Sequence, residues 1–345
     1  MVENSAYSRN PTVSIIVPFY NVKECVSYCL DSLLAQTYDD YEIICVDDGS
    51  TDGTLDLLEE YAKTHDRIRV VSQKNGGAAS ARNNGVAQSH GKYISFVDGD
   101  DIVSPFYLEA LVRNIEGHTA RMVVGTHKDV PLSAVFDTNE IDLHWDVPES
   151  IRVLSRQEMM EEMLYEEVLS SACMRLASRE IYERNPFPEG MYYEDIATGS
   201  VYAAECDSFI RVDEPIYGYV MKPGSVVHRK SATMKQALDY EESIERFIRN
   251  AAPYVESDVG IHCFRILELI RLYRLLQKVG DEDKRKIHME DSIRKYVRDH
   301  KDACVNNGRV LPINRFRARL MAGSPWLLMR LSDIYDRRVK SVRYE

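Results

Sequence analysis

Short apolar runs alternate with amphipathic segments over the first hundred residues of the chain. The apolar runs, rich in Val and Ile, lie at 13–17, 42–46, 68–71 and 93–97. The segments between them repeat apolar residues at spacings of three and four, and lie at 25–35, 55–62 and 78–88. Apolar strands that alternate with helices are typical of a parallel sheet covered on both faces. We therefore predict an α/β, Rossmann-like fold with a mixed, mostly parallel sheet flanked by helices.

Beyond residue 100 the pattern becomes mixed and then helical. We predict helices at 105–114, 157–166 and 195–204, strands at 122–125, 209–212 and 216–220, and an irregular stretch at 128–152. From residue 231 onward, apolar residues recur largely at helical spacing. The prediction is a sheet domain over 1–230 followed by a helical C-terminal region over 231–345.

Polar residues cluster where the predicted strands end, and ligands of such sheets bind beyond the carboxyl ends of the strands. Asp98, Gly99, Asp100 and Asp101 follow the run at 93–97. Clustered carboxylates repel one another unless a cation or hydrogen-bond donors neutralise them, and hard oxygen ligands suit Mg²⁺ or Mn²⁺. Gly99 lets a ligand approach the backbone closely. The alternative interpretation is an Asp-rich turn that caps the next helix.

A second acidic segment, Asp47 to Asp52, follows the run at 42–46. An Asp here can accept a hydrogen bond from a ribose hydroxyl or a pyrimidine N–H, or it can belong to a turn and helix N-cap. The sequence contains no GxGxxG after the first strand and no GxxxxGK[ST]. Dinucleotide-binding and P-loop functions are therefore disfavoured.

The 345-residue chain is acidic overall, but its charge is distributed unevenly along the sequence. The net charge of −12 argues against broad nucleic-acid binding. Residues 309–345 hold nine Arg or Lys against three Asp or Glu, which gives +6 and leaves −18 for the rest. The seven cysteines form no CxxC pair, so we expect reduced thiols and a cytoplasmic location. We expect no secretion signal and no spanning helix, because no apolar run reaches about 18 residues.

Several motifs, in order along residues 13–228, resemble those of the family 2 glycosyltransferases. They are Val13–Asn21, Ser32–Tyr38, Asp47–Asp52, Asn75–Gly77, Ala81–Gly85, Phe96–Asp101, Tyr193–Asp195, Pro215–Tyr219 and Gly224–Ser225. The resemblance implies the GT-A fold and transfer of a sugar from a nucleoside diphosphate donor, most simply a UDP-sugar, to a saccharide or lipid-linked acceptor. The segment 172–175 departs from the Trp- or Lys-containing family pattern.

The resemblance also implies roles for individual residues. The nucleotide would be held by Pro18, Tyr20, Asp48, Arg82, Asp98 and Gly99. Asp98 and Asp100 would form the DxD pair that binds Mn²⁺ or Mg²⁺, with Asp100 the more direct ligand. Asp195 would be the general base, and Glu194 would contact the donor or acceptor sugar.

Physical chemistry requires the same set of groups. A divalent cation stabilises the charge that builds on the leaving diphosphate, and a separate carboxylate takes the proton of the acceptor hydroxyl. A single displacement by that hydroxyl predicts inversion at the anomeric carbon. Asp195 has the alternative role of capping the helix at 195–204.

Other candidates have two interpretations each. His228 is either a further metal or diphosphate ligand or an ordinary surface histidine. Trp145 either stacks on an acceptor sugar or fills a gap in the core. The basic, Trp- and Leu-containing segment 309–345 either contacts an anionic membrane, at the inner face, or docks as a helix on the acidic body or a second subunit.

Three functions are therefore compared. The first is an inverting, metal-dependent glycosyltransferase of surface polysaccharide or glycoconjugate synthesis. The second is a nucleotidyltransferase, which the missing Gly-rich phosphate loop disfavours. The third is a non-catalytic nucleotide-sugar-binding scaffold, which the joint presence of Asp98, Asp100 and Asp195 disfavours. The sequence leaves open whether the chain forms a homo-oligomer.

Overall fold

The structure is a computed structural model, which describes residues 10–136, 145–222, 231–280, 283–332 and 334. The chain divides into two compact units, each built from three stretches of sequence. The sheet unit comprises Met1–Ser155, Ser171–Gly190 and Glu205–Met221. The helical unit comprises Arg156–Ser170, Met191–Ala204 and Lys222–Glu345.

The sheet unit is built on one mixed sheet with strand order β3-β2-β1-β4-β8-β6-β9-β5, to which β7 adds by pairing with β9. Its strands are β1 (Val13–Phe19), β2 (Tyr41–Asp47), β3 (Ile68–Ser72), β4 (Tyr93–Phe96), β5 (Ile102–Val103), β6 (Met122–Pro131), β7 (Ile151–Ser155), β8 (Arg175–Ser178) and β9 (Ser208–Met221). The first four are mutually parallel, whereas β8 runs antiparallel to both β4 and β6. The predicted mixed sheet is confirmed.

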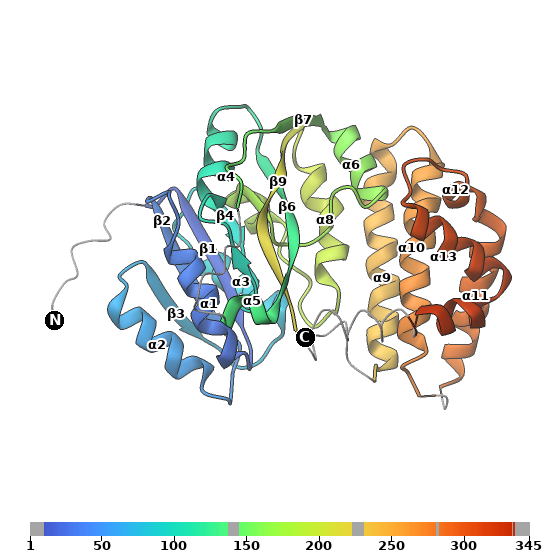
Figure 1. Cartoon of the computed structure of the whole chain (residues 1–345), viewed down its shortest axis with the longest axis horizontal. Coiled ribbons are helices and arrows are strands. Elements are labelled where there is room, and N and C mark those ends of the chain that lie inside the picture. The colour runs from blue at the N-terminus through green and yellow to red at the C-terminus, as the bar shows by residue number, and fades with distance from the viewer. Residues whose placement is uncertain (1–9, 137–144, 223–230, 281–282, 333, 335–345) are drawn as a thin grey trace. The chain divides into compact units, whose positions relative to one another are not determined.

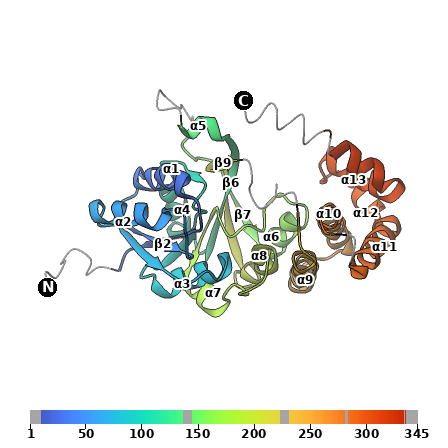
Figure 2. The same ribbon diagram turned by 90° about the horizontal axis from the view of Figure 1, so that it is seen from below.

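Helices cover both faces of this sheet. They are α1 (Lys23–Leu34), α2 (Thr54–Thr64), α3 (Ala78–Gln88), α4 (Tyr107–Glu116), α5 (Leu132–Phe136) and α7 (Arg179–Arg184). Figure 2 shows α1 and α2 on one face, and α3 and α7 on the other. The central strands β1 and β2 are almost entirely buried between these layers, which explains why their sequences lack polar alternation.

The first hundred residues fold as predicted, and the main differences lie beyond them. The two runs at 209–212 and 216–220 form a single strand, β9, which contains Pro215. The stretch 128–152, expected to be irregular, contains the end of β6, the helix α5 and the first residues of β7. The short strands β5 and β8 were not predicted, because two to four residues carry too little pattern to identify.

The helical unit is formed by the predicted helices of the C-terminal region together with two earlier ones. They are α6 (Arg156–Leu164), α8 (Glu194–Ala204), α9 (Met234–Ala251), the 3₁₀ turn η2 (Ala252–Tyr254), α10 (Asp258–Leu276), α11 (Lys284–His300), α12 (Asp302–Val305), α13 (Pro312–Gly323) and a helix at 325–332. The long helix α10 is central, since it packs against α6, α9, α11, α12 and α13 (Figure 1). The division predicted from the sequence, a sheet domain over 1–230 and a helical region over 231–345, stays a prediction.

Polar contacts stabilise the helical unit, and the one between α9 and α10 is buried. Tyr240 of α9 donates a hydrogen bond of 2.5 Å to Glu268 of α10. Arg271 forms ion pairs with Glu268 and with Glu166. Burial raises the pKa of Glu268, although the guanidinium of Arg271 acts in the opposite direction. Within the described residues, no helix has the length and apolar character needed to cross a bilayer.

Candidate active site

Three polar loops follow β1, β2 and β4, whose carboxyl ends lie at the same edge of the sheet because the strands are parallel. The loops after β1 and β2 are tied together by short contacts. The Asp48 amide donates to the Phe19 carbonyl at 2.8 Å, and the Asn21 amide donates to Ser50 Oγ at 3.0 Å. The Thr51 amide donates to Asn21 Oδ1 at 2.8 Å. The first two predicted nucleotide-binding segments therefore form one connected surface.

Pro18 and Tyr20 lie at the end of β1. Pro18 is opposite Val46 of β2, so its carbonyl stands at the edge where the loops meet. The Tyr20 side chain is 50% exposed, which leaves its ring available to stack on a ligand. Asn21 turns the chain with a positive φ of 50°, a conformation that Asn tolerates better than most residues.

Asp48 is buried and holds the neighbouring loop. Its carboxylate accepts hydrogen bonds of 2.8 Å from Gln73 Nε2 and from the amides of Gly76 and Gly77. Gly77 has a φ of 85°, which favours glycine at this position. In this structure the carboxylate organises the glycine loop, so its predicted contact with the nucleotide stays a proposal.

Arg82 and Asp98 form the ion pair at the centre of the site. Arg82 projects from α3, is 6% exposed, and donates to Asp98 Oδ1 at 2.9 Å. The Asp98 side chain is 39% exposed, so the partly exposed carboxylate is anchored by a buried guanidinium. The Arg82 guanidinium also lies 5.5 Å from the ring centroid of Phe187. This pair links Arg82, which is predicted to approach the nucleotide, to the loop 98–101.

The loop 98–101 is pressed against the end of β1 at Gly99. A Cβ atom at this glycine would lie 2.5 Å from the Phe19 ring and 2.8 Å from the Pro18 carbonyl oxygen. The loop is closed by a hydrogen bond of 3.0 Å from the Asp101 amide to the Asp98 carbonyl. Its second carboxylate, Asp100, is partly exposed, and the Asp100 carbonyl accepts from the Tyr28 hydroxyl at 3.1 Å. Gly99 is therefore required by close backbone packing.

Asp101 is the member of the acidic cluster that points inward. It is 3% exposed and accepts hydrogen bonds from the Tyr217 hydroxyl at 2.7 Å and the Val220 amide at 2.8 Å. The Tyr217 hydroxyl also accepts from the Asp98 amide at 3.2 Å. Burial, with Asp100 and Asp98 nearby, raises the pKa of Asp101 well above its ordinary value, and the two hydrogen bonds lower it. This contact fastens the loop to β9.

Sequence reasoning gave no role to Asp101 or Tyr217 individually. In the sequence, Tyr217 lies within a segment that resembles the family pattern, and Asp101 is one acid of a cluster. Their contact spans 116 residues of sequence, so no local pattern signals it. The available hint was an additional acid directly after the DxD pair.

Glu194 and Asp195 open α8, in the helical unit. The Asp195 carboxylate accepts a hydrogen bond of 2.9 Å from the Ile196 amide, and the Glu194 carbonyl accepts one of 2.8 Å from Thr198. Just before them, Tyr193 has a φ of 61° and its ring stacks on Tyr240 with 4.3 Å between centroids. A positive φ in an aromatic residue is strained and is a feature of functional sites.

The other candidates from the sequence are His228, Trp145 and the cysteines. His228 lies outside the described residues. Trp145 packs against the buried cluster of Ile102, Val130 and Val220, and the Lys128 ammonium lies 3.8 Å from its ring centroid. This favours the packing interpretation of the tryptophan. All seven cysteines are buried free thiols, as expected.

The donor set at the strand end fits a hard divalent cation. Asp98 and Asp100, two residues apart, have partly exposed carboxylates, whereas the Asp101 carboxylate is buried and hydrogen-bonded to Tyr217. Mg²⁺ is usually held by one or two carboxylates together with substrate phosphates. Among the described residues there is no group of three or more His, Cys, Asp or Glu side chains arranged to hold an ion.

Comparison with known proteins gives one consistent family. The family model described as "Glycosyl transferase family 2" matches residues 14–185. The uncharacterized glycosyltransferase EpsJ of Bacillus subtilis is 36% identical over 225 residues, which are 63% of this chain and 63% of EpsJ. Glycosyltransferase GlyG of Streptococcus pneumoniae is 27% identical over 271 residues, 76% of this chain and 87% of GlyG.

Solved structures show the same fold. Residues 1–349 of S. aureus TarS in complex with UDP-GlcNAc superimpose with a TM-score of 0.61 over 95% of this chain and 92% of that one, at 19% identity. The predicted GT-A fold is therefore confirmed. The ordered motifs, the family model and the named relatives agree: the chain belongs to glycosyltransferase family 2.

Proposed function

We propose that the protein is an inverting, metal-assisted glycosyltransferase. It transfers a sugar from a nucleoside diphosphate donor, a UDP-sugar, to a hydroxyl of a saccharide or lipid-linked acceptor. The observation that carries the proposal is the meeting of three loops at one edge of the sheet, where the Arg82–Asp98 pair adjoins Asp100. Such an edge is where α/β sheets bind nucleotides.

On the donor side, the chain provides orientation and charge. Tyr20 and the Pro18 carbonyl contact the base, and the loop held by Asp48 forms the floor of the nucleotide site. Arg82 lies beside the diphosphate, and its burial fixes the guanidinium in advance of binding. Asp98 and Asp100 would hold Mn²⁺ or Mg²⁺, which would stabilise the negative charge of the leaving diphosphate.

On the acceptor side, one carboxylate takes one proton. Asp195 accepts the proton of the attacking hydroxyl, a contribution of about 10²–10⁴-fold to the rate. Glu194 orients the sugar beside it. The acceptor oxygen attacks the anomeric carbon from the face opposite the leaving diphosphate, so the C–O bond forms as the bond to the diphosphate breaks. The product has the inverted anomeric configuration.

The comparisons support the choice of substrate class. The TarS structure was solved with UDP-GlcNAc, which favours a UDP-sugar donor for this chain. This chain spans 63% of the length of EpsJ. The acceptor of this chain, and its place in the synthesis of surface polysaccharides or glycoconjugates, are therefore part of the proposal. A location on the cytoplasmic side of a membrane and assembly into a homo-oligomer also stay predictions.

A donor screen tests the proposal. The protein is incubated with a panel of UDP-, GDP- and dTDP-sugars, with Mn²⁺, Mg²⁺ or EDTA, and the released nucleotide is identified. We expect free nucleoside diphosphate with one donor and only when the metal is present. Pyrophosphate instead would indicate a nucleotidyltransferase. Binding without turnover of any donor, including with candidate oligosaccharide acceptors, would indicate a non-catalytic scaffold.

A further inference from the structure

The last two described helices bury one face and expose the other. In α13 the buried residues Asn314, Ala318 and Met321 recur at spacings of four and three, so they form one side of the helix. In the helix at 325–332, Leu328 and Ser332 are buried in the same way. The helices therefore pack on the helical unit with one face and leave the opposite face exposed.

The outer surface is rich in large apolar side chains. Seven of the large apolar residues exposed in the described part of the chain lie between positions 311 and 334: Leu311, Ile313, Phe316, Trp326, Leu327, Leu331 and Ile334. Trp326 is 65% exposed. Single exposed apolar residues are ordinary, but a concentration of this kind within 24 residues marks an interaction surface.

The same surface is basic. Residues 310–332 include Arg315, Arg317, Arg319 and Arg330, and no Asp or Glu. The Arg330 guanidinium lies 4.9 Å from the Trp326 ring centroid, so charge and aromatic ring share one patch. Two copies of this chain meeting through the patch would bring these like charges together, which disfavours a second copy as its occupant.

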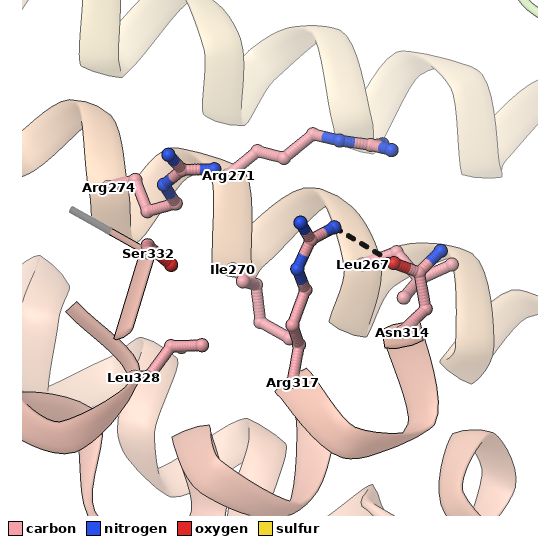
Figure 3. A pocket seen from close by; sticks show the side chains of 8 residues that line it. All are labelled: Leu267, Ile270, Arg271, Arg274, Asn314, Arg317, Leu328 and Ser332. Carbon is pink, nitrogen blue, oxygen red and sulfur yellow. Dashed lines mark hydrogen bonds between the residues drawn. The ribbon is translucent and has the colours of Figure 1, made fainter. Parts of the chain in front are cut away.

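Behind the patch lies a pocket with the same character (Figure 3). Its lining combines three arginines with apolar walls and contains no acidic residue: Leu267, Ile270, Arg271, Arg274, Asn314, Arg317, Leu328 and Ser332. Arg271 is ion-paired with Glu166 and Glu268. Arg317 donates to Asn314 Oδ1 at 3.2 Å.

We propose that α13 and the helix at 325–332 form a docking surface for an anionic phospholipid bilayer. Exposed Trp, Phe, Leu and Ile side chains enter the interface, and the arginines pair with lipid phosphates, as in amphipathic helices that lie on membranes. The remainder of the chain outside 309–345 carries a net charge of −18, so the excess of positive charge that an anionic membrane would attract lies in the segment that contains this surface. The proposal goes beyond glycosyl transfer and is tested independently of it.

Vesicle flotation of the full chain tests the proposal. Vesicles of phosphatidylcholine alone are compared with vesicles that contain 30% phosphatidylglycerol. A triple variant, Arg315→Gln, Arg319→Gln and Arg330→Gln, removes three charges from the surface. Since each basic residue near an anionic surface contributes about 1 kcal/mol, the variant is expected to bind about 100-fold more weakly.

A matched control removes three charges elsewhere in the helical unit. Lys284→Gln, Lys295→Gln and Arg298→Gln change exposed positions of α11 and should leave binding close to that of the wild type. Circular dichroism checks that both variants fold. Full-length protein that fails to float with the anionic vesicles, or surface and control variants that bind equally, would overturn the proposal.

The fluorescence of Trp326 gives a second test. In a Trp145→Phe background Trp326 is the one remaining tryptophan of the chain. We expect its emission to move to shorter wavelength when anionic vesicles are added, because its exposed ring leaves water. An unchanged spectrum in the presence of bound vesicles, or a dimer in sedimentation that the triple variant dissociates, would contradict lipid docking.

Discussion

Replacing Tyr217 by Phe removes one hydroxyl from the buried contact that joins the 98–101 loop to β9. That hydroxyl donates to Asp101 at 2.7 Å and accepts from the Asp98 amide at 3.2 Å. The variant keeps the ring and its packing, so it tests the contacts of the hydroxyl and not those of the ring. Asp101 would retain the Val220 amide as a donor.

The size of the effect follows from the charge and burial of the partner. A hydrogen bond to a charged group contributes about 1.5–3 kcal/mol, so we expect the sheet unit to lose about 2–3 kcal/mol of unfolding free energy at a pH where Asp101 is ionised. For a unit of this size that lowers the unfolding temperature by roughly 4–12 °C. Because the Tyr217 hydrogen bond stabilises the ionised form of Asp101, the loss should be larger at pH 8 than at pH 5.

Thermal unfolding at the two pH values and calorimetric titration with Mn²⁺ are the measurements. We expect weaker Mn²⁺ binding in the variant, since Asp98 and Asp100 lose their fixed position. Tyr107→Phe is the matched control: its buried hydroxyl pairs with Ser95 at 2.7 Å, a neutral contact outside the loop, so it should cost about 1 kcal/mol and leave Mn²⁺ affinity unchanged. Equal stability and equal Mn²⁺ affinity in Tyr217→Phe and the wild type would refute the reasoning.

Two further predictions concern packing and pH. Gly99→Ala should lower the free energy of unfolding, measured with denaturant, by about 1–3 kcal/mol, because the added Cβ would meet the Phe19 ring. Gly280→Ala is the control and should be nearly neutral, because no atom lies within 4 Å of a Cβ at that position. Equal losses in the two variants would contradict the packing argument. Burial raises the pKa of Glu268 in the folded protein. The stability that this carboxyl group contributes is therefore fully present below its pKa in the unfolded chain, and it declines as the pH rises toward its pKa in the folded protein. Glu268→Gln should therefore flatten the fall in stability above about pH 4.5, and an unchanged pH profile would argue against the shift.

The first half of the sheet could be predicted from the sequence because β1 and β2 are buried on both faces, which makes their residues apolar throughout. The later strands could not. In β9, Asp213, Glu214 and Pro215 interrupt the apolar run, and the shifts of register against β6 fall at the same place, so one strand reads as two. The two-residue β5 exists because β9 pairs with it, a contact invisible in its own sequence.

The candidate site shows the same limit. Strand ends and motif order located Asp98, Asp100 and Arg82 at one edge, because parallel topology follows from the pattern. Which carboxylate faces inward is decided by distant partners. Tyr217 draws Asp101 into the interior, and two glycine amides engage Asp48. Neither arrangement has a local signature.

The central claim is that Asp195 removes the proton of the acceptor hydroxyl while the carboxylates of the DxD loop serve the donor. Asp195→Asn tests it most directly, with donor binding measured by calorimetry and turnover measured with the donor and acceptor that the wild type uses. We predict donor affinity within about twofold of the wild type and turnover reduced by at least about 10²-fold. Unchanged turnover, or loss of turnover that is fully explained by lost donor binding, would contradict the account.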